Sequence, residues 1–126
     1  MGYHHVDVAD IEPTPDRPST KRSISDACGL DRLAAHVYDV VPGEKIPLAY
    51  HYHDEQEEVF YVTVGELHVQ TPDAEYAVPA GDAFVCEPES PQFAFVPEDG
   101  QQTTVFVVGA PAVDDVHPYE PDAEEP

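Results

Sequence analysis

Prolines and glycines divide the middle of this 126-residue chain into segments too short for ordinary helices. The chain holds 14 prolines and 7 glycines, and turn sequences such as VPGEK, TPDAE and PEDG separate runs rich in valine, phenylalanine and tyrosine. These runs are RLAAHVYDVV, KIPLAYHYH, EVFYVTVG, ELHVQT, EYAVPAG, DAFVCE, QFAFV and TTVFVVG. Many short strand-like runs between turns predict an all-β sandwich or barrel. Only SISDACGLDRL favours a short helix.

The length predicts one domain with two flanking segments. We expect an N-terminal arm over residues 1–32, a barrel over 33–109 and an acidic, proline-rich tail over 110–126. Within the arm, residues 11–22 are polar and rich in proline, which predicts irregular structure. Most of the tail is expected to be mobile, because so polar a sequence buries little apolar surface.

The chain is strongly acidic along its whole length. It has 5 Lys and Arg residues against 26 Asp and Glu residues, a formal charge of −21. The three thirds of the chain hold 7, 9 and 10 acids. Such a surface repels itself unless salt screens it, which favours the cytoplasm of a halophile. An acidic module that mimics nucleic acid or binds its partners is the alternative, and direct nucleic-acid binding is not expected without a basic face.

The cysteines and the N-terminus indicate a reduced, cytoplasmic protein. Cys28 and Cys86 form no CxxC pair, and MGYHHVDVADIEP lacks the basic and apolar regions of a signal peptide. No apolar run reaches the length of a membrane span. We therefore expect no membrane partner and a core position for Cys86.

The stretch AYHYHDEQEEVFYVTVGEL contains the strongest candidate site. Alternate side chains of a strand share a face, so His51 and His53 point one way and Tyr50 and Tyr52 the other. If the strand that begins at Glu58 pairs antiparallel with the first, its carboxylate faces the imidazoles and completes a facial triad. Glu57 could replace Glu58 as the carboxylate. A strand with two imidazoles beside a solvated acidic turn is the alternative.

The same stretch resembles the first motif of the cupin superfamily. Its elements are Gly43, His51, His53, Glu58 and Gly65, and VPAGDAFVCEPESPQFAF resembles the second motif through Pro79, Gly81, Asp82, Pro88 and Pro91. The resemblance covers about residues 33–108 and implies a cupin double-stranded β-helix, a jelly-roll barrel with the site inside. It departs from the family at Gln92, where the third histidine is usual, and at Val96, where an asparagine is usual.

The resemblance implies a metal centre and a direction for the strand residues. One divalent transition metal ion, of iron, manganese, nickel or zinc, is expected on His51, His53 and Glu58, with Gln92 as a weaker fourth ligand. Alternation then turns four residues inward: Phe60, Val62, Ala94 and Val96. It turns four others outward: Val59, Tyr61, Phe93 and Phe95. An outer face with four large apolar groups needs a cover, which predicts a homodimer.

The scarcity of cations bears on the ligand. Only Arg32 and Lys45 lie near the predicted strands, while Arg17, Lys21 and Arg22 belong to the arm. A small neutral or aromatic molecule is therefore favoured, and an anionic one is expected only if the arm folds over the mouth. His36 shares a face with Tyr38 and could reach the cavity. No role is predicted for four other histidines: His4, His5, His68 and His117.

Three functions remain open at this stage. The first is a metal-dependent enzyme, a dioxygenase-type oxidoreductase or an isomerase, with its catalytic residues unassigned. The second is a non-catalytic cupin that binds a small ligand or a metal. The third is a structural cupin without metal.

Overall fold

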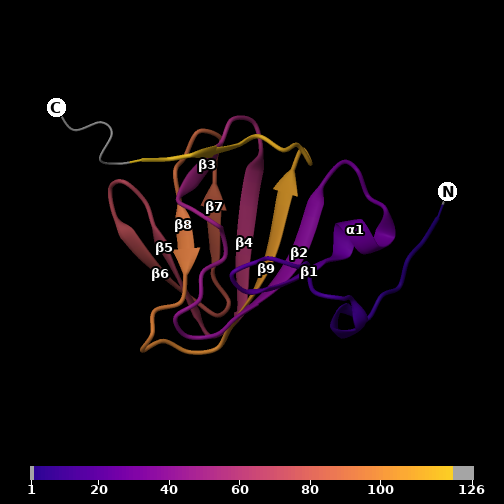
Figure 1. The fold of residues 1–126 in the computed structure, drawn as a ribbon, viewed down its shortest axis with the longest axis horizontal. Helices are drawn as coiled ribbons and strands as arrows, with labels where there is room; N and C mark the ends of the chain where they lie inside the picture. The colour runs from indigo at the N-terminus through magenta and orange to yellow at the C-terminus, as the bar shows by residue number, and fades with distance from the viewer. Residues whose placement is uncertain (1, 121–126) are drawn as a thin grey trace.

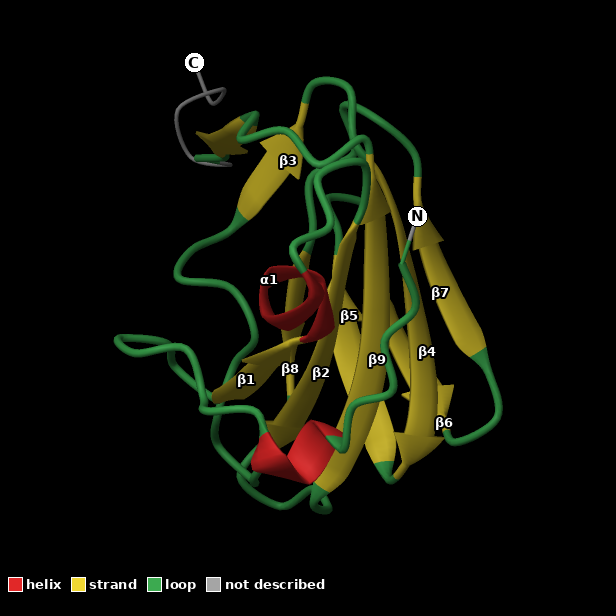
Figure 2. Cartoon of the chain, turned by 90° about the vertical axis from the view of Figure 1, so that its right-hand side faces the viewer, coloured by secondary structure: helices red, strands yellow, loops and turns green. Residues whose placement is uncertain are grey.

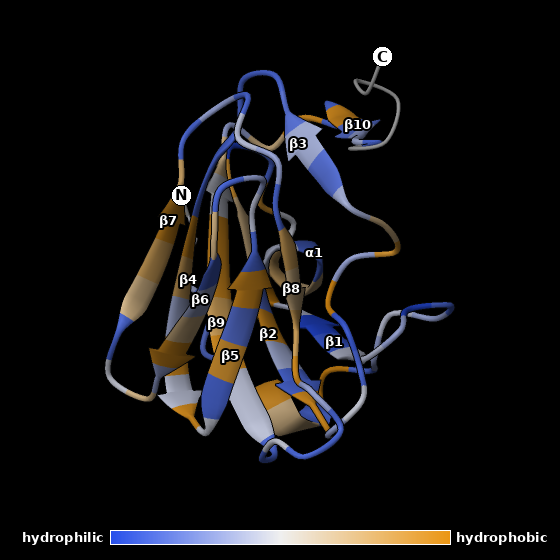
Figure 3. Ribbon diagram, turned by 90° about the vertical axis from the view of Figure 1, so that its left-hand side faces the viewer, coloured by the Kyte–Doolittle hydropathy of each residue, from blue (hydrophilic) through white to orange (hydrophobic). Residues whose placement is uncertain are grey.

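The fold consists of two facing β-sheets, described here from a computed structural model that places residues 2–120. The larger sheet has the order β1 (Thr20–Ser23), β2 (Ala34–Val40), β9 (Thr103–Ala110), β4 (Glu57–Val64) and β7 (Ala83–Cys86). The smaller has the order β6 (Glu75–Pro79), β5 (Glu66–Gln70) and β8 (Phe93–Phe95). A third pair joins β10 (Val116–Pro118) to β3 (His51–His53). Figures 1 and 2 show the larger sheet, and Figure 3 shows the smaller one in front of it.

The strands predicted from the eight apolar runs are all present, and all strand pairs are antiparallel. The larger and smaller sheets are separate in the described part of the chain, so the all-β fold is a jelly-roll sandwich whose sheets do not close on each other. Phe60 and Val62 of β4 face Ala94 and the nearby Val96 in the core between the sheets, as predicted, and each is at most 3% exposed. The rest of the core comes from both sheets and from the connection between β2 and β3: Tyr38, Val40, Ile46, Leu67, Val69, Val78, Cys86, Val105 and Val107.

Gly65 forms the tight turn that carries the chain from the larger sheet into the smaller one. Its φ of 81° lies in the left-handed region, and a Cβ there would meet the Thr103 Cα at 2.9 Å. The Thr103 hydroxyl donates to the carbonyl oxygen of Glu66 and accepts from its N–H, both at 3.1 Å. Any side chain at residue 65 would therefore push β4 and β5 away from β9.

The N-terminal arm is irregular for most of its length, but it also extends the larger sheet. Thr20–Ser23, part of which was predicted to be irregular, pairs with β2 as strand β1. Ser23 then caps the predicted short helix α1 (Ile24–Cys28), because its hydroxyl accepts from the Asp26 N–H at 3.1 Å. A single 3-10 turn, η1 (Val8–Asp10), precedes these elements. The polar sequence of Thr20–Ser23 did not indicate a strand, because β1 lies at the edge of the larger sheet, where one side of the strand faces solvent.

The expectation of a mobile C-terminal tail is wrong for the part that the structure describes. Val116–Pro118 forms β10, which pairs with β3, and the Tyr119 N–H donates to the Tyr50 carbonyl oxygen at 2.9 Å. Figure 1 shows this segment in yellow as it crosses beside β3. Strand β3 would otherwise present unpaired backbone groups to solvent, and the tail satisfies them. Residues 121–126 lie outside the described residues.

The four residues expected on one outward face lie on two faces. Val59 and Tyr61 belong to β4 of the larger sheet, with 43% and 44% exposed, whereas Phe93 and Phe95 belong to β8 of the smaller sheet. The sheets face each other, so their outer faces point in opposite directions (Figures 2 and 3). One partner surface cannot cover all four residues, and that part of the prediction is wrong. No helix within residues 2–120 is long and apolar enough to cross a membrane.

Candidate metal centre

Strand β3 presents its two histidines to the interior and its tyrosines to the C-terminal segment, as the alternation predicted. The rings of His51 and His53 lie 5.1 Å apart. On the other side of the strand, Tyr52 stacks on His117 at 5.3 Å between ring centroids, and Tyr50 lies 5.0 Å from Tyr119. The aromatic side chains of the C-terminal segment therefore pack with these tyrosines on the outer face, while the imidazoles face inward.

Hydrogen bonds fix the orientation of both imidazoles. The Nδ1–H of His51 donates to the Ala49 carbonyl oxygen at 2.9 Å, and Nδ1 of His53 lies 2.9 Å from Oδ1 of Asp115. A carbonyl can only accept, so the proton of a neutral His51 sits on Nδ1 and its Nε2 carries a lone pair. In both rings Nε2 is then the atom directed toward the site, which is the arrangement that a metal-binding histidine requires.

Glu58 reaches the imidazoles across the sandwich. Its Oε1 lies 3.2 Å from Nε2 of His53. The hypothesis that β4 pairs with β3 is wrong, because β4 pairs with β7 and β9 in the larger sheet while β3 pairs with β10. Glu58 meets His53 because they sit on facing layers. Glu57, the alternative carboxylate, is exposed and outside this group.

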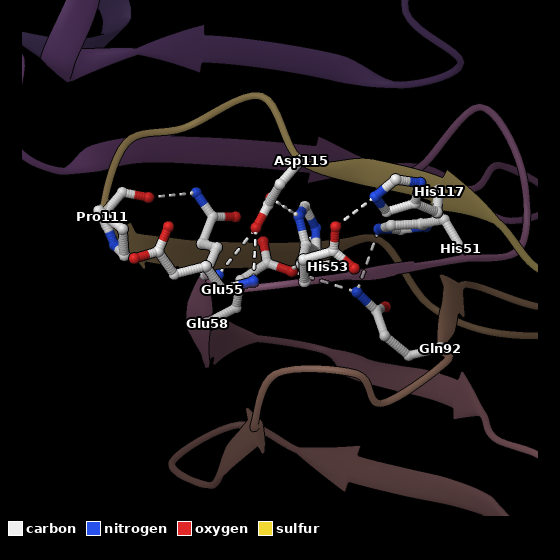
Figure 4. A network of polar contacts seen from close by, with 10 residues as sticks. His51, His53, Glu55, Glu58, Gln92, Pro111, Asp115 and His117 are labelled. Carbon is white, nitrogen blue, oxygen red and sulfur yellow. Dashed lines mark hydrogen bonds and ion pairs between the residues drawn. The ribbon is translucent and has the colours of Figure 1, made fainter.

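Gln92 joins the same cluster from beside β3. Its N–H donates to the His51 carbonyl oxygen at 2.9 Å, and its side chain is almost wholly buried. The amide nitrogen lies 3.3 Å from Nε2 of His51 and 3.2 Å from Oε1 of Glu58. If the side-chain amide of Gln92 is rotated by 180°, its oxygen rather than its nitrogen faces His51 and Glu58. Figure 4 shows His51, His53, Glu58 and Gln92 converging.

The donor set fits a first-row transition metal. The nitrogens of His51 and His53 and an oxygen of Glu58 all lie within 4.8 Å of one another. Two ligands at about 2.1 Å from an ion and about 90° apart are about 3 Å from each other, close to the 3.2 Å between His53 and Glu58. Two imidazoles and one carboxylate on one side leave further positions for water or a ligand. The group could therefore hold a metal ion.

Asp115 is a site residue that the sequence analysis missed. Besides holding Nδ1 of His53, its carboxylate accepts from the N–H of Glu55 at 2.7 Å and of Gln56 at 3.0 Å (Figure 4). Burial acts to raise the pKa of Asp115, but these hydrogen bonds outweigh it and hold the pKa at about 2. Nothing in the acidic tail distinguished Asp115 from Asp114, because only the pairing of β10 with β3 selects it.

The two imidazoles have opposite electrostatic environments. Hydrogen bonding to Glu58 raises the pKa of His53 to about 9, with Asp115 adding to the effect and burial opposing it. Burial lowers the pKa of His51, and the nearby charge of His53 lowers it further. The metal-free cluster thus contains one neutral imidazole and one that shares its proton with carboxylates, a proton that a metal ion would displace.

The cluster lines a cavity of about 390 Å³ with mixed walls. Apolar surface comes from Ile46, Phe60 and Val107, among others. Two cations of the N-terminal segment, Arg17 and Lys21, also line it. An anionic ligand was expected only if the N-terminal arm folded over the site, and Arg17 and Lys21 of that arm line the cavity.

His36 and Tyr38 also line the cavity, as their shared face on β2 predicted. Burial lowers the pKa of His36 to about 4, and burial raises the pKa of Tyr38 to about 12. Nδ1 of His36 is buried and has no hydrogen-bond partner among the described residues. Both groups are therefore neutral near neutral pH. His36 and Tyr38 are polar lining residues of the cavity that do not belong to the metal cluster.

The remaining predicted residues lie elsewhere. Cys86 is buried in the core, and burial raises the pKa of its thiol to about 12. His68 contacts Glu66 at 3.1 Å, and His117 contacts Asp54 at 2.6 Å, so both have carboxylate partners that the sequence did not indicate. His4 and His5 are exposed in the N-terminal arm.

Comparison with solved structures shows the same fold in bacterial proteins. The chain is similar to the polyketide cyclase RemF from Streptomyces resistomycificus, with a TM-score of 0.76, 24% identity, and 94% of this chain and 87% of that one covered. It is similar to a sugar phosphate isomerase from Silicibacter pomeroyi, with a TM-score of 0.72, 26% identity, and 85% and 75% covered. For a proposed sugar phosphate isomerase from Acidithiobacillus ferrooxidans the TM-score is 0.68 at 22% identity; 78% of this chain is covered, and only 62% of that chain.

Comparison at the level of sequence identifies the family. A search of curated proteins finds no match. The family model described as the cupin domain matches residues 36–109. That range runs from within β2 to the next-to-last residue of β9, and it contains His51, His53, Glu58 and Gln92. The chain belongs to the cupin domain family.

Proposed function

We propose that this protein is a small metal-dependent cupin that binds and transforms a small molecule in the cavity beside its metal centre. The observation that carries the proposal is the set of His51, His53 and Glu58, three ligand groups that converge on one point and line the cavity. A catalytic metal site keeps open positions facing a space for substrate, and this arrangement offers both.

Each residue has a distinct part in the proposed centre. Nε2 of His51, Nε2 of His53 and a carboxylate oxygen of Glu58 hold the ion, and Gln92 is the fourth, weaker partner. When bound, the ion supplies Lewis acidity, or redox chemistry if it is iron or manganese. Asp115 keeps the His53 ring in place. The neutral imidazole of His36 is within the cavity and can accept or donate a proton there.

The reaction class that we favour is an isomerisation, with a dioxygenase-type oxidation as the second candidate. The similar structures include a sugar phosphate isomerase and a polyketide cyclase. A metal that polarises a carbonyl beside a neutral imidazole suits such chemistry. The apolar walls favour a compact ligand with an aromatic or aliphatic body. A non-catalytic cupin that binds a ligand or a metal, and a structural cupin without metal, are the alternatives.

The test is the metal content of protein purified without a histidine tag and incubated in turn with ferrous, manganous, nickel and zinc ions. The wild type should bind one ion per chain. His51→Ala and Glu58→Ala should abolish stoichiometric binding, Gln92→Ala should weaken it modestly, and Gln92→His should tighten it, because imidazole is the better donor.

His68→Ala is the matched control, since His68 also contacts a glutamate but lies outside the cluster; its metal content should equal that of the wild type. A folded wild type that takes up none of the four ions would refute the centre and leave the structural cupin as the function. If metal binds and Gln92→His binds it no more tightly, Gln92 serves a ligand's hydrogen bond outside the coordination sphere.

We also propose that the protein works as a homodimer in the cytoplasm of a halophile. The charge of −21 supports the salt-rich environment. The interface we now favour uses the outer face of the larger sheet alone. There Val59 of β4 pairs with Val85 of β7, and these residues and Tyr61 are 43%, 61% and 44% exposed, respectively. Adjacent apolar side chains on an open sheet face are typical of a covered surface.

A further inference from the structure

Cations are rare in this protein, and two of them line the cavity. The chain has 5 Lys and Arg residues in all. Arg17 precedes β1 and Lys21 lies in it, and both border the cavity that contains His51 and Glu58. Arg17 and His51 also border an adjoining hollow of about 350 Å³. Basic side chains are therefore concentrated next to the proposed metal centre, in a chain whose surface is otherwise acidic.

Neither of these cations forms an ion pair with a carboxylate in the described part of the chain, although Glu58 and Asp114 line the same cavity. Within residues 2–120, the single ion pair between a Lys or Arg and a carboxylate joins Arg22 to Asp39. Arg17 donates from Nη2 to the Ile46 carbonyl oxygen at 3.2 Å and interacts with the Tyr38 hydroxyl, while its Nε is buried without a partner in the described part of the chain. The Lys21 ammonium has no hydrogen-bond acceptor there, although the chain contains 26 acidic residues.

The two charges also act on each other and on the site. Burial lowers the pKa of Lys21, and the charge of Arg17 lowers it further against the opposing effect of Asp26. Arg17 also lines both the cavity and the adjoining hollow together with His51, which places its charge near the proposed metal ligands. Two neighbouring cations that repel each other and lose hydration destabilise the empty cavity, and an anion bound between them would remove that cost.

We propose that the molecule bound in this cavity carries an oxyanion, a carboxylate or a phosphate, that Arg17 and Lys21 hold while its body lies against the apolar wall beside His51, His53 and Glu58. The proposal deepens the proposed function, because it concerns the ligand of the same cavity. It replaces the preference for a neutral ligand, which rested on the assumption that the arm stays away. An unpartnered guanidinium nitrogen and a free ammonium supply charge-assisted hydrogen bonds to oxyanions.

The test is isothermal titration of metal-free protein with benzoate, phenyl phosphate and the neutral analogue benzamide, at one fixed low KCl concentration. Metal-free protein is used so that no anion binds directly to an ion. At least one of the two anions should bind at least tenfold more tightly than benzamide. Whichever anion binds more tightly identifies the oxyanion as a carboxylate or a phosphate.

Two variants locate the binding. Arg17→Gln and Lys21→Met should each weaken binding of the preferred anion about tenfold, as expected for a lost charge-assisted hydrogen bond, and leave benzamide unchanged. Arg17→Lys should recover part of the affinity. The control is Arg32→Gln, which removes an exposed cation outside the cavity and should change anion affinity less than twofold. Circular dichroism of each variant verifies its fold.

The proposal is overturned if benzamide binds as tightly as both anions, if no anion binds, or if Arg17→Gln and Lys21→Met bind the anion as the wild type does. Its failure is distinct from that of the metal centre, because metal uptake is measured on the same preparations. A wild type that takes up metal but does not discriminate between benzoate and benzamide loses only the oxyanion proposal. One that discriminates but takes up no metal loses only the metal centre.

Discussion

The segments that flank the family domain use their charged groups in opposite ways. The N-terminal segment brings Arg17 and Lys21 to the cavity, and neither forms an ion pair with a carboxylate within residues 2–120. The C-terminal segment brings Asp115 to the same region and engages both of its oxygens, with His53, Glu55 and Gln56. One segment offers free charge to a ligand, and the other uses its charge to hold a ligand group of the proposed metal centre.

The difference shows that a flanking segment can complete a site in two ways: its side chains can bind the ligand, or they can orient the residues that do. An unpaired cation has unused hydrogen-bonding capacity, so its loss should affect what binds in the cavity. A carboxylate that already accepts three hydrogen bonds has little remaining capacity to bind a ligand, so its loss should affect the groups that it orients. The two effects should therefore be separable by mutation.

Asp115→Ala should produce the largest effect and the sharpest separation. Without the carboxylate, the Nδ1–H of His53 loses its acceptor and the ring loses its fixed orientation, so metal affinity should fall by about 10–100-fold. Competition titration with a chromophoric chelator measures it. Arg17→Gln should leave the same affinity within about threefold.

Asp114→Ala serves as the matched control, because Asp114 is the exposed neighbour of Asp115 and accepts none of the three hydrogen bonds. If Asp115→Ala retains metal affinity within threefold, or if Arg17→Gln loses as much as Asp115→Ala, the two flanks do not differ as described.

The N-terminal cations should also affect how stability depends on pH, through His36. The pKa of His36 is lowered from 6.5 to about 4, by burial first and by Lys21 second. The unfolded chain therefore binds this proton more readily than the folded one. His36 imposes no cost above about pH 6.5, and stability is lost as pH falls from there toward about 4. After discounting for partial exposure, the loss should be about 2 kcal/mol.

Urea unfolding of wild type and His36→Gln between about pH 7 and pH 4.5 isolates this effect from the titration of the many carboxylates, which both proteins share. Stability of the wild type should decrease more steeply than that of the variant. Lys21→Met should reduce the difference, because it removes a charge that lowers the pKa of His36. Parallel curves for wild type and His36→Gln would mean that His36 is not the buried neutral group described.

Salt should act in opposite directions on the two kinds of charge. Three of the 5 Lys and Arg residues lie between residues 17 and 22, and none lies in the C-terminal segment. Molar KCl screens the repulsion of the acidic surface, so the thermal midpoint should rise by several degrees, the equivalent of about 1 kcal/mol. The same salt should weaken benzoate binding at Arg17 and Lys21.

Sedimentation velocity at the same two salt concentrations tests the proposed homodimer, which screening should favour. A midpoint that is flat or falls with KCl would refute the halophile hypothesis. A monomer in molar KCl would refute the dimer on the larger sheet.

Much of the sandwich was predictable because its signals are local. Prolines and glycines mark the turns, and the valine- and phenylalanine-rich runs between them all became strands. The alternation of side chains assigned His51 and His53 to one face of β3, and it predicted that Phe60 and Val62 are buried. Spacing along a single strand needs no knowledge of its partners.

The amino-acid sequence by itself determined the all-β architecture, the cupin motifs and three groups that could hold a metal, because each depends on periodicity or spacing within a short stretch. Tertiary structure alone decided which strands pair, so Glu58 meets His53 across the sandwich rather than along a hairpin. It also decided that residues from both flanks, Arg17, Lys21 and Asp115, reach the cavity or the cluster beside it. The neighbouring sequence does not indicate that a polar residue such as Asp115 will reach the site, because its hydrogen-bond partner can lie far away in the chain. His53 and Asp115 are 62 positions apart.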